Sequence, residues 1–148
     1  MKTISRLKRA GLGLVTVGTM VLAGIGPGAA QTAYQPKFRG DPAHSNSEAV
    51  ALGYARTLMR AQHLYQKKNG QYATALTELV HVGSFTRRMT ETQQGDYRVS
   101  FHPRKDGFEL TMIPKQMDAD HRSFYANEKG ALHGDEQKTA NEESPVLK

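Results

Sequence analysis

The chain has 148 residues, of which 38% are hydrophobic and 23% charged, a composition typical of one modest globular domain. It contains no cysteine, which excludes disulfide frameworks, thiol nucleophiles and thiolate zinc sites. The formal net charge of +6 is concentrated at the start, because residues 31–148 carry 16 basic and 14 acidic side chains. Net charge alone therefore does not indicate a polyanion-binding protein.

The first 30 residues have the layout of a secretion signal. A basic stretch from Met1 to Arg9 precedes an apolar run from Ala10 to Gly26, and small residues follow. As a helix this run would span roughly 25 Å, which is less than the ~30 Å of a membrane core. We predict a cleaved signal peptide that ends at Ala30, with Gln31 as the first mature residue, and an uncleaved membrane anchor is the alternative. In both cases the rest of the chain is exported to the periplasm or the extracellular space.

Two polar segments flank the predicted domain. Residues 31–46 contain Pro36, Gly40 and Pro42 without apolar periodicity, and we predict a flexible linker there. Residues 134–148 are rich in charged and amide side chains, which bury too little surface to offset chain entropy, and we predict a disordered polar tail. Residues 47–133 remain as the predicted folded domain.

A long helix is predicted from Ser47 to Asn69, because apolar residues recur there at helical spacing. The predicted buried stripe is Val50, Tyr54, Leu58, Ala61 and Tyr65. Ser47 is the expected N-cap residue, and Gly70 is expected to end the helix in the left-handed conformation. One face of this helix is therefore expected to pack on the rest of the domain.

After Gly70 the pattern changes from helical to alternating. We predict a two-turn helix over Thr74–His81 and a loop over Thr86–Gly95. A hairpin follows, with Tyr97, Val99 and Phe101 facing inward on its first strand and Phe108, Leu110 and Met112 on its second. A third strand is predicted over Arg122–Ala126, with a turn at Asn127–Gly130 and a continuation through Ala131, Leu132 and His133. The expected fold is α+β, with a long N-terminal helix packed on an antiparallel sheet of three or four strands.

Four segments of the chain, taken in their order, resemble the globular part of type IV pilins and type II secretion pseudopilins. They are YQKKNGQYATALTEL at 65–79, DYRVSF at 96–101, GFELTMIP at 107–114 and RSFYANEKGALHG at 122–134. Pilin-like domains similarly end their long helix at a Tyr and a Gly, and continue with Gly-x-Tyr-x-x-x-Leu-x-x-Leu. The prepilin signature is absent, since Pro27 follows Gly26 and no acidic residue occurs before Asp41. The resemblance thus implies a pilin-like domain that is exported by the general route.

The function that this resemblance implies is that of a non-enzymatic accessory component of a type IV pilus or a type II secretion system. Its expected partners are envelope or secretion-system proteins, and it would meet a membrane only through an uncleaved signal segment. The alternative is a secreted or periplasmic binding module that uses the same small α+β fold. Such a module would recognise a ligand or polymer through the loop Thr86–Gly95.

The sequence shows no motif for catalysis, a cofactor or a metal. The nearest approach to a metal site is Asp118, Asp120 and His121, which lack the Gly and the closing Glu of a calcium loop. No serine lies in a Gly-x-Ser-x-Gly elbow, and no histidine has a zinc-motif partner. The basic residues of the helix and the following loop are interpreted as a solvated face, not as a nucleic-acid site: Arg56, Arg60, Lys67, Lys68, Arg87 and Arg88.

Overall fold

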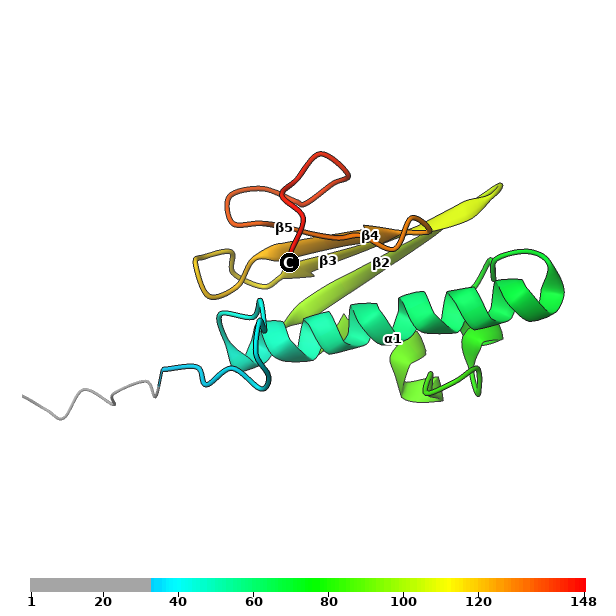
Figure 1. The fold of residues 1–148 in the computed structure, drawn as a ribbon, viewed down its shortest axis with the longest axis horizontal. Helices are drawn as coiled ribbons and strands as arrows, with labels where there is room; N and C mark the ends of the chain where they lie inside the picture. Colours follow the sequence, from blue (N-terminus) through cyan, green and yellow to red (C-terminus); the bar gives the residue numbers. More distant parts are fainter. Residues whose placement is uncertain (1–32) are drawn as a thin grey trace, which may run out of the picture. The chain divides into compact units, whose positions relative to one another are not determined.

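Helix α1 (Asn46–Asn69) lies along one face of an antiparallel sheet in the computed structural model (Figure 1), which describes residues 33–148. The sheet has five strands in the order β1-β2-β3-β4-β5, so every strand is paired with its neighbour in the sequence. This arrangement confirms the predicted α+β fold with a long helix packed on an antiparallel sheet. The sheet has five strands, not the predicted three or four, because the two-residue strand Gln93–Gln94 also pairs with it. The predicted signal peptide and its cleavage site between Ala30 and Gln31 lie outside the described residues.

The elements between α1 and the main strands are short. They are η1 (Leu76–Leu79), η2 (Arg87–Thr90) and β1 (Gln93–Gln94). The predicted two-turn helix over Thr74–His81 is therefore wrong, because only one 3-10 turn forms. The carboxylate of Glu78 accepts hydrogen bonds from the backbone N–H groups of Thr74 (2.6 Å) and Ala75 (3.0 Å), which closes this single turn.

The main sheet is built by β2 (Tyr97–Arg104), β3 (Gly107–Pro114), β4 (Ser123–Asn127) and β5 (Leu132–Asp135). The predicted hairpin is confirmed, since β2 and β3 pair along their full length from Tyr97↔Pro114 to Arg104↔Gly107. Alternation places one set of side chains against α1: Tyr97, Val99, Phe108, Leu110, Met112, Phe124, Ala126 and Leu132 belong to the core. Tyr97 and Phe124 stack across the sheet with ring centroids 5.6 Å apart.

The ends of α1 follow from local capping. Gly70 ends the helix as predicted, with φ of 79° and its N–H bonded to Gln66 O at 2.8 Å. The N-cap residue is Ser45, not Ser47, because Ser45 Oγ accepts the Glu48 N–H at 3.1 Å. Ser45 and Glu48 have the Ser-x-x-Glu spacing of a capping box, a signal that the sequence already carried.

The buried face of α1 differs in part from the predicted stripe. Tyr54, Leu58 and Ala61 are buried as predicted, and Tyr65 is half-buried. Val50 is 53% exposed, so its predicted burial is wrong. The helix is instead rotated so that five other side chains complete the buried arc: Glu48, Ala51, Leu52, Ala55 and Gln62.

The C-terminal segment covers the face of the sheet opposite α1, which corrects the predicted disordered tail over 134–148 (Figure 1). Ala140 and Ser144 are buried, and Ser123 Oγ of β4 accepts the Ala140 N–H at 2.8 Å. Leu147 N–H donates to Leu132 O at 2.8 Å, so the chain also pairs with the outer edge of β5. Backbone hydrogen bonds hold this polar segment on the sheet, although it has too few apolar side chains to be held there by burial alone.

Candidate functional site

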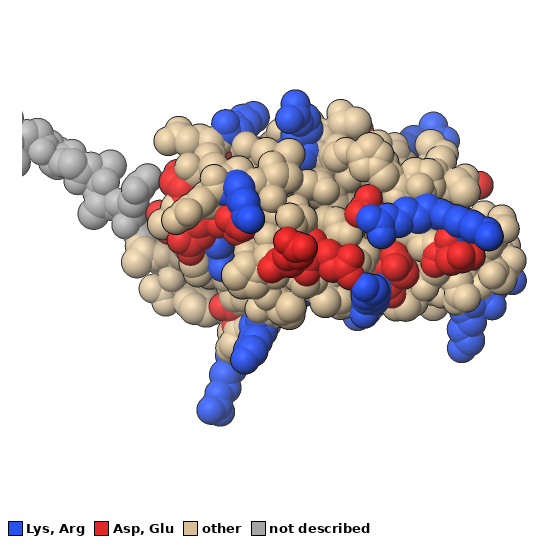
Figure 2. Space-filling view, turned by 90° about the horizontal axis from the view of Figure 1, so that it is seen from above, with Lys and Arg blue, Asp and Glu red and all other residues tan. Residues whose placement is uncertain are grey.

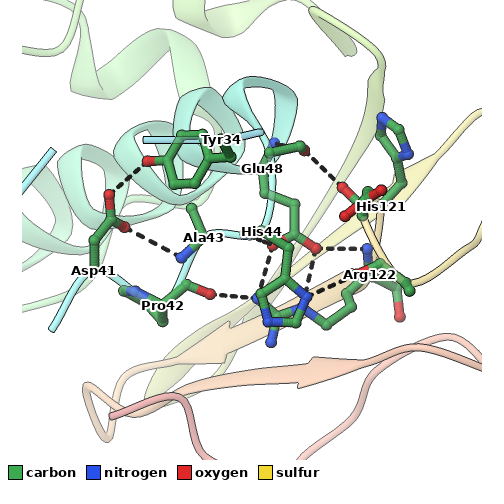
Figure 3. Close-up of polar contacts among 12 residues, drawn as sticks. Tyr34, Asp41, Pro42, Ala43, His44, Glu48, His121 and Arg122 are labelled. Atoms are coloured by element: carbon green, nitrogen blue, oxygen red, sulfur yellow. Dashed lines mark hydrogen bonds and ion pairs between the residues drawn. The ribbon is translucent and has the colours of Figure 1, made fainter. Parts of the chain in front are cut away.

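A buried ion pair fastens the N-terminal end of α1 to the start of β4 (Figure 3). Glu48 is fully buried and Arg122 is 8% exposed. Glu48 Oε1 accepts the backbone N–H of Arg122 at 2.8 Å and its Nε–H at 2.9 Å, while Oε2 accepts an Nη2–H at 2.7 Å. Oε2 also accepts the backbone N–H of His44 at 2.8 Å, so the carboxylate receives four hydrogen bonds. These hydrogen bonds compensate for the hydration that the two charged groups lose on burial.

The segment before α1 packs onto this ion pair, which corrects the predicted flexible linker over 31–46 for its described residues. Asp41 accepts hydrogen bonds from the Tyr34 hydroxyl (2.5 Å) and from the N–H of Ala43 (3.1 Å), and Ala43 is buried (Figure 3). The hydrogen bond from Tyr34 is the main reason that the pKa of Asp41 lies below its usual value. The carbonyl of Pro42 accepts a further hydrogen bond from Arg122.

The start of α1 is also tied to the loop between β3 and β4. His44 Nδ1 donates to Ala119 O at 2.7 Å, and Ser45 Oγ donates to Asp120 O at 2.6 Å. These two hydrogen bonds position the start of α1 against that loop. We call the contacts of Glu48, Arg122, His44 and Ser45 the junction.

One buried polar group beside the junction has no partner among the described residues. It is the hydroxyl of Tyr97, a residue with no exposed surface. Burial raises the pKa of this hydroxyl, so it stays protonated.

Asp118, Asp120 and His121, the nearest approach to a metal motif in the sequence, lie in one turn, but their three side chains do not point to a common centre. His121 Nδ1 lies 2.8 Å from Asp118 Oδ1, and this hydrogen bond is the main cause of the lowered pKa of Asp118. Asp120 contributes its backbone N–H to the same carboxylate at 2.9 Å. Within residues 33–148, no three His, Cys, Asp or Glu side chains are grouped so that they could hold a metal ion.

The serines are used mainly in structural hydrogen bonds. Ser123 and Ser144 are buried, and they hold the C-terminal segment. The nearest arrangement to a nucleophile with a base is on the outer face of β2, where Ser100 Oγ lies 2.9 Å from His102 Nε2. Both side chains are open to solvent, and no carboxylate of the described chain bonds the second nitrogen of His102. A catalytic triad also needs a carboxylate that orients the histidine through its second nitrogen.

The loop Thr86–Gly95, which the alternative function uses for recognition, is partly fixed by its own contacts. It contains η2 and β1, so the prediction of a plain loop is only coarsely right. The Tyr54 hydroxyl donates to Met89 O at 2.9 Å, and Gln94 Nε2 donates to Arg88 O at 3.1 Å. The side chain of Arg88 remains exposed.

Comparisons with known proteins add no family to this architecture. No protein-family model matches the chain, and neither does any curated protein or solved structure. What the protein does is therefore inferred from its own residues and surfaces.

A shallow polar recess of about 440 Å³ lies where the C-terminal segment meets β2, β3 and β4. Its lining residues are Arg104, Glu109, Tyr125, Asn141, Glu142 and Glu143. Tyr125 donates to Glu109 Oε1 at 2.8 Å, and Arg104 forms an ion pair with the same carboxylate. Figure 2 shows acidic side chains gathered in a band across the face seen there. These carboxylates are partly neutralised, since Glu142 is paired with Lys129.

The two halves of the described chain differ in charge. Residues 33–90, which include α1, contain eight basic and three acidic side chains. Residues 91–148, which include the main strands, contain eight basic and eleven acidic side chains. The small net charge of residues 31–148 averages over this asymmetry and hides it.

Proposed function

We propose that this protein is an exported, non-enzymatic, pilin-like module that serves as an accessory component of a type IV pilus or a type II secretion system. The observation that supports this most is the order of the fold, in which a 24-residue helix precedes a sheet of consecutive antiparallel strands. The quoted segments that resemble pilins lie at the end of α1 and on β2, β3, β4 and β5, in the order that the resemblance implies.

The junction also favours a scaffold over an enzyme. Glu48 and Arg122 are the most buried charged pair in the described chain, and their hydrogen bonds fix the start of α1 against β4. A rigid helix–sheet unit can present its outer surfaces to partners in a fixed geometry. Within residues 33–148, no helix is long and apolar enough to cross a membrane.

The proposal is tested by isolating the tagged full chain from cross-linked envelope fractions of its own cell and quantifying the co-purified proteins by mass spectrometry. We expect enrichment of subunits or assembly proteins of a pilus or a type II secretion system. Enrichment of unrelated proteins only would contradict the proposal.

The alternative binding module is tested in the same preparation. It predicts a retained ligand or polymer that is lost when the exposed loop residues Arg87 and Arg88 are both changed to Gln. Changing Lys105 and Lys138 to Gln is the matched control, because both are exposed and lie outside the loop. A ligand that is lost only with the loop substitutions, without secretion or pilus proteins, would replace the first proposal by the second.

A further inference from the structure

The outer face of α1 carries basic side chains that form no ion pair among the described residues, although the Asp41 carboxylate lies close enough to Arg56 to attract it. Its exposed cationic or titratable residues are Arg56, Arg60, His63, Lys67 and Lys68. None of them forms an ion pair in the part of the chain that the structure describes. The only acidic residue of α1 is Glu48, which is buried in the junction, and the sequence has no other Asp or Glu until Glu78. The second half of the helix, from Arg56 to Lys68, therefore presents a positive surface.

Exposed apolar side chains lie on the same surface. Val50 is 53% exposed and Leu64 is 44% exposed, and both are on α1. Phe38, which is 52% exposed, lies against the same surface, with its ring centroid 5.6 Å from Arg56 Cζ. Among the described residues, only Val146 is a comparably exposed large apolar side chain elsewhere.

Helical spacing arranges these residues in two adjacent rows. Val50, Gly53, Thr57 and Leu64 are three, four and seven residues apart, so they share one row along the helix. Arg56, Arg60, His63 and Lys67 are four, three and four residues apart, and they form the neighbouring row. We call the two rows together the outer helix face.

We infer that the outer helix face binds flat on an anionic lipid surface. The basic row would contact headgroup phosphates, while Val50, Leu64 and Phe38 would enter the boundary between headgroups and acyl chains, as in interfacial amphipathic helices. A nucleic acid fits this face less well, because contacts with its backbone come from polar side chains and would leave the apolar row in water. The inference does not depend on the pilin-like function, since it uses only this face.

The charge of the face is tested by co-sedimentation of the full chain with vesicles of phosphatidylglycerol and phosphatidylcholine. Changing Arg60 and Lys67 to Gln should weaken binding to anionic vesicles about 30-fold, because each basic residue near such a surface contributes about fivefold. Changing Arg98 and Lys105 to Gln removes the same charge from the sheet side and should weaken binding less than about threefold. Both variants keep the basic, apolar N-terminal segment, so their difference reports the helix face.

The apolar row is tested by a second matched pair. Val50→Thr should weaken binding about fivefold, since it removes an apolar contact without changing charge. Val146→Thr changes an equally exposed valine at the other side of the domain and should leave binding unchanged. Circular dichroism melting shows that each variant is folded, and the valine pair decides the matter if the charge variant unfolds.

Three outcomes would overturn the inference. One is equal loss in both members of each pair, which would indicate a general charge or stability effect. Another is binding to vesicles of phosphatidylcholine alone that is as tight as binding to the anionic vesicles and is the same for all variants. The third is binding to duplex DNA, at the same salt concentration, that is tighter than vesicle binding and depends on Arg60 and Lys67, which would identify the face as a nucleic-acid site.

Discussion

Two fully buried polar side chains of α1, Glu48 and Gln62, attach the helix to different parts of the domain. Glu48 holds the N-terminal end of α1 through the cation of Arg122. Gln62 holds the other half through an uncharged amide, whose Oε1 accepts the Ala73 N–H at 2.9 Å and whose Nε2 donates to Ala73 O at 3.1 Å. Although both side chains are equally buried, the stability of the fold should depend more on Glu48 than on Gln62. Loss of Glu48 leaves a buried charge without its partner, whereas loss of Gln62 leaves only two neutral backbone groups without a hydrogen bond.

The largest effect is expected for Glu48→Ala. It should reduce the free energy of unfolding by about 3 to 5 kcal/mol, because Arg122 would stay buried without its counter-ion. Urea denaturation followed by circular dichroism measures this loss. The control is Glu142→Ala, which breaks the exposed pair with Lys129 and should change stability little.

Replacing both members of the pair sharpens this prediction. Changing Glu48 and Arg122 together to Met should recover most of the lost stability, since no charge is then left unpaired. A double variant as unstable as Glu48→Ala would show that the shape of the junction matters more than its charge.

Leu58 lies on α1 between the two polar attachments and provides an apolar reference. It has no exposed surface, so Leu58→Ala should cost about 2 to 5 kcal/mol by creating a cavity. Arg60→Ala on the exposed side should cost no more than about 0.5 kcal/mol. Equal shifts of the urea midpoint for the two variants would mean that the buried face of the helix is wrongly placed.

Gln62→Ala should have a smaller effect than Glu48→Ala, about 1 to 3 kcal/mol. The substitution leaves the N–H and the carbonyl of Ala73 buried without partners. Gln66→Ala, one turn further along α1 and half-buried, is the matched control and should cost less. A loss for Gln62→Ala as large as that for Glu48→Ala would remove the distinction between the charged and the neutral attachment.

Tyr97→Phe is the smallest expected change and has the opposite sign. The Tyr97 hydroxyl is buried without a partner in the described chain, so its removal should leave the free energy of unfolding unchanged or raise it by about 1 kcal/mol. Thermal melting of the variant measures this. A clear loss of stability would show that the hydroxyl makes a hydrogen bond, for instance to an internal water, beside the junction.

Periodic apolar residues predict the fold well because they report burial directly. The alternation of Phe108, Leu110 and Met112 predicts β3, and the spacing of Tyr54 and Leu58 predicts the packed side of α1. The burial of Glu48 could not be read in this way, since its partner Arg122 is 74 residues away and only the folded chain brings them together. The resemblance to pilins stays a prediction.

The terminal segments were harder to predict for a related reason. Composition treats residues 134–148 as too polar to fold, yet Ser123, Asp135 and Asn141 bind backbone groups of that segment. The contact of Ser123 depends on the finished sheet, whereas those of Asp135 and Asn141 are turns between residues three apart, and a pattern of apolar residues predicts neither kind. The Ser-x-x-Glu spacing at Ser45 was the one local signal that could have located the start of α1 more accurately.

The final residues of the chain have a consequence for solubility. Gly134 N–H bonds Pro145 O at 3.0 Å, and Val146 forms an antiparallel bridge with His133, so the last residues occupy the outer edge of β5. An open edge strand is a template onto which another polypeptide can add. Residues 145–147 cover that template, and cleavage by a protease after Asn141 would expose the edge of β5, onto which further chains could add and aggregate.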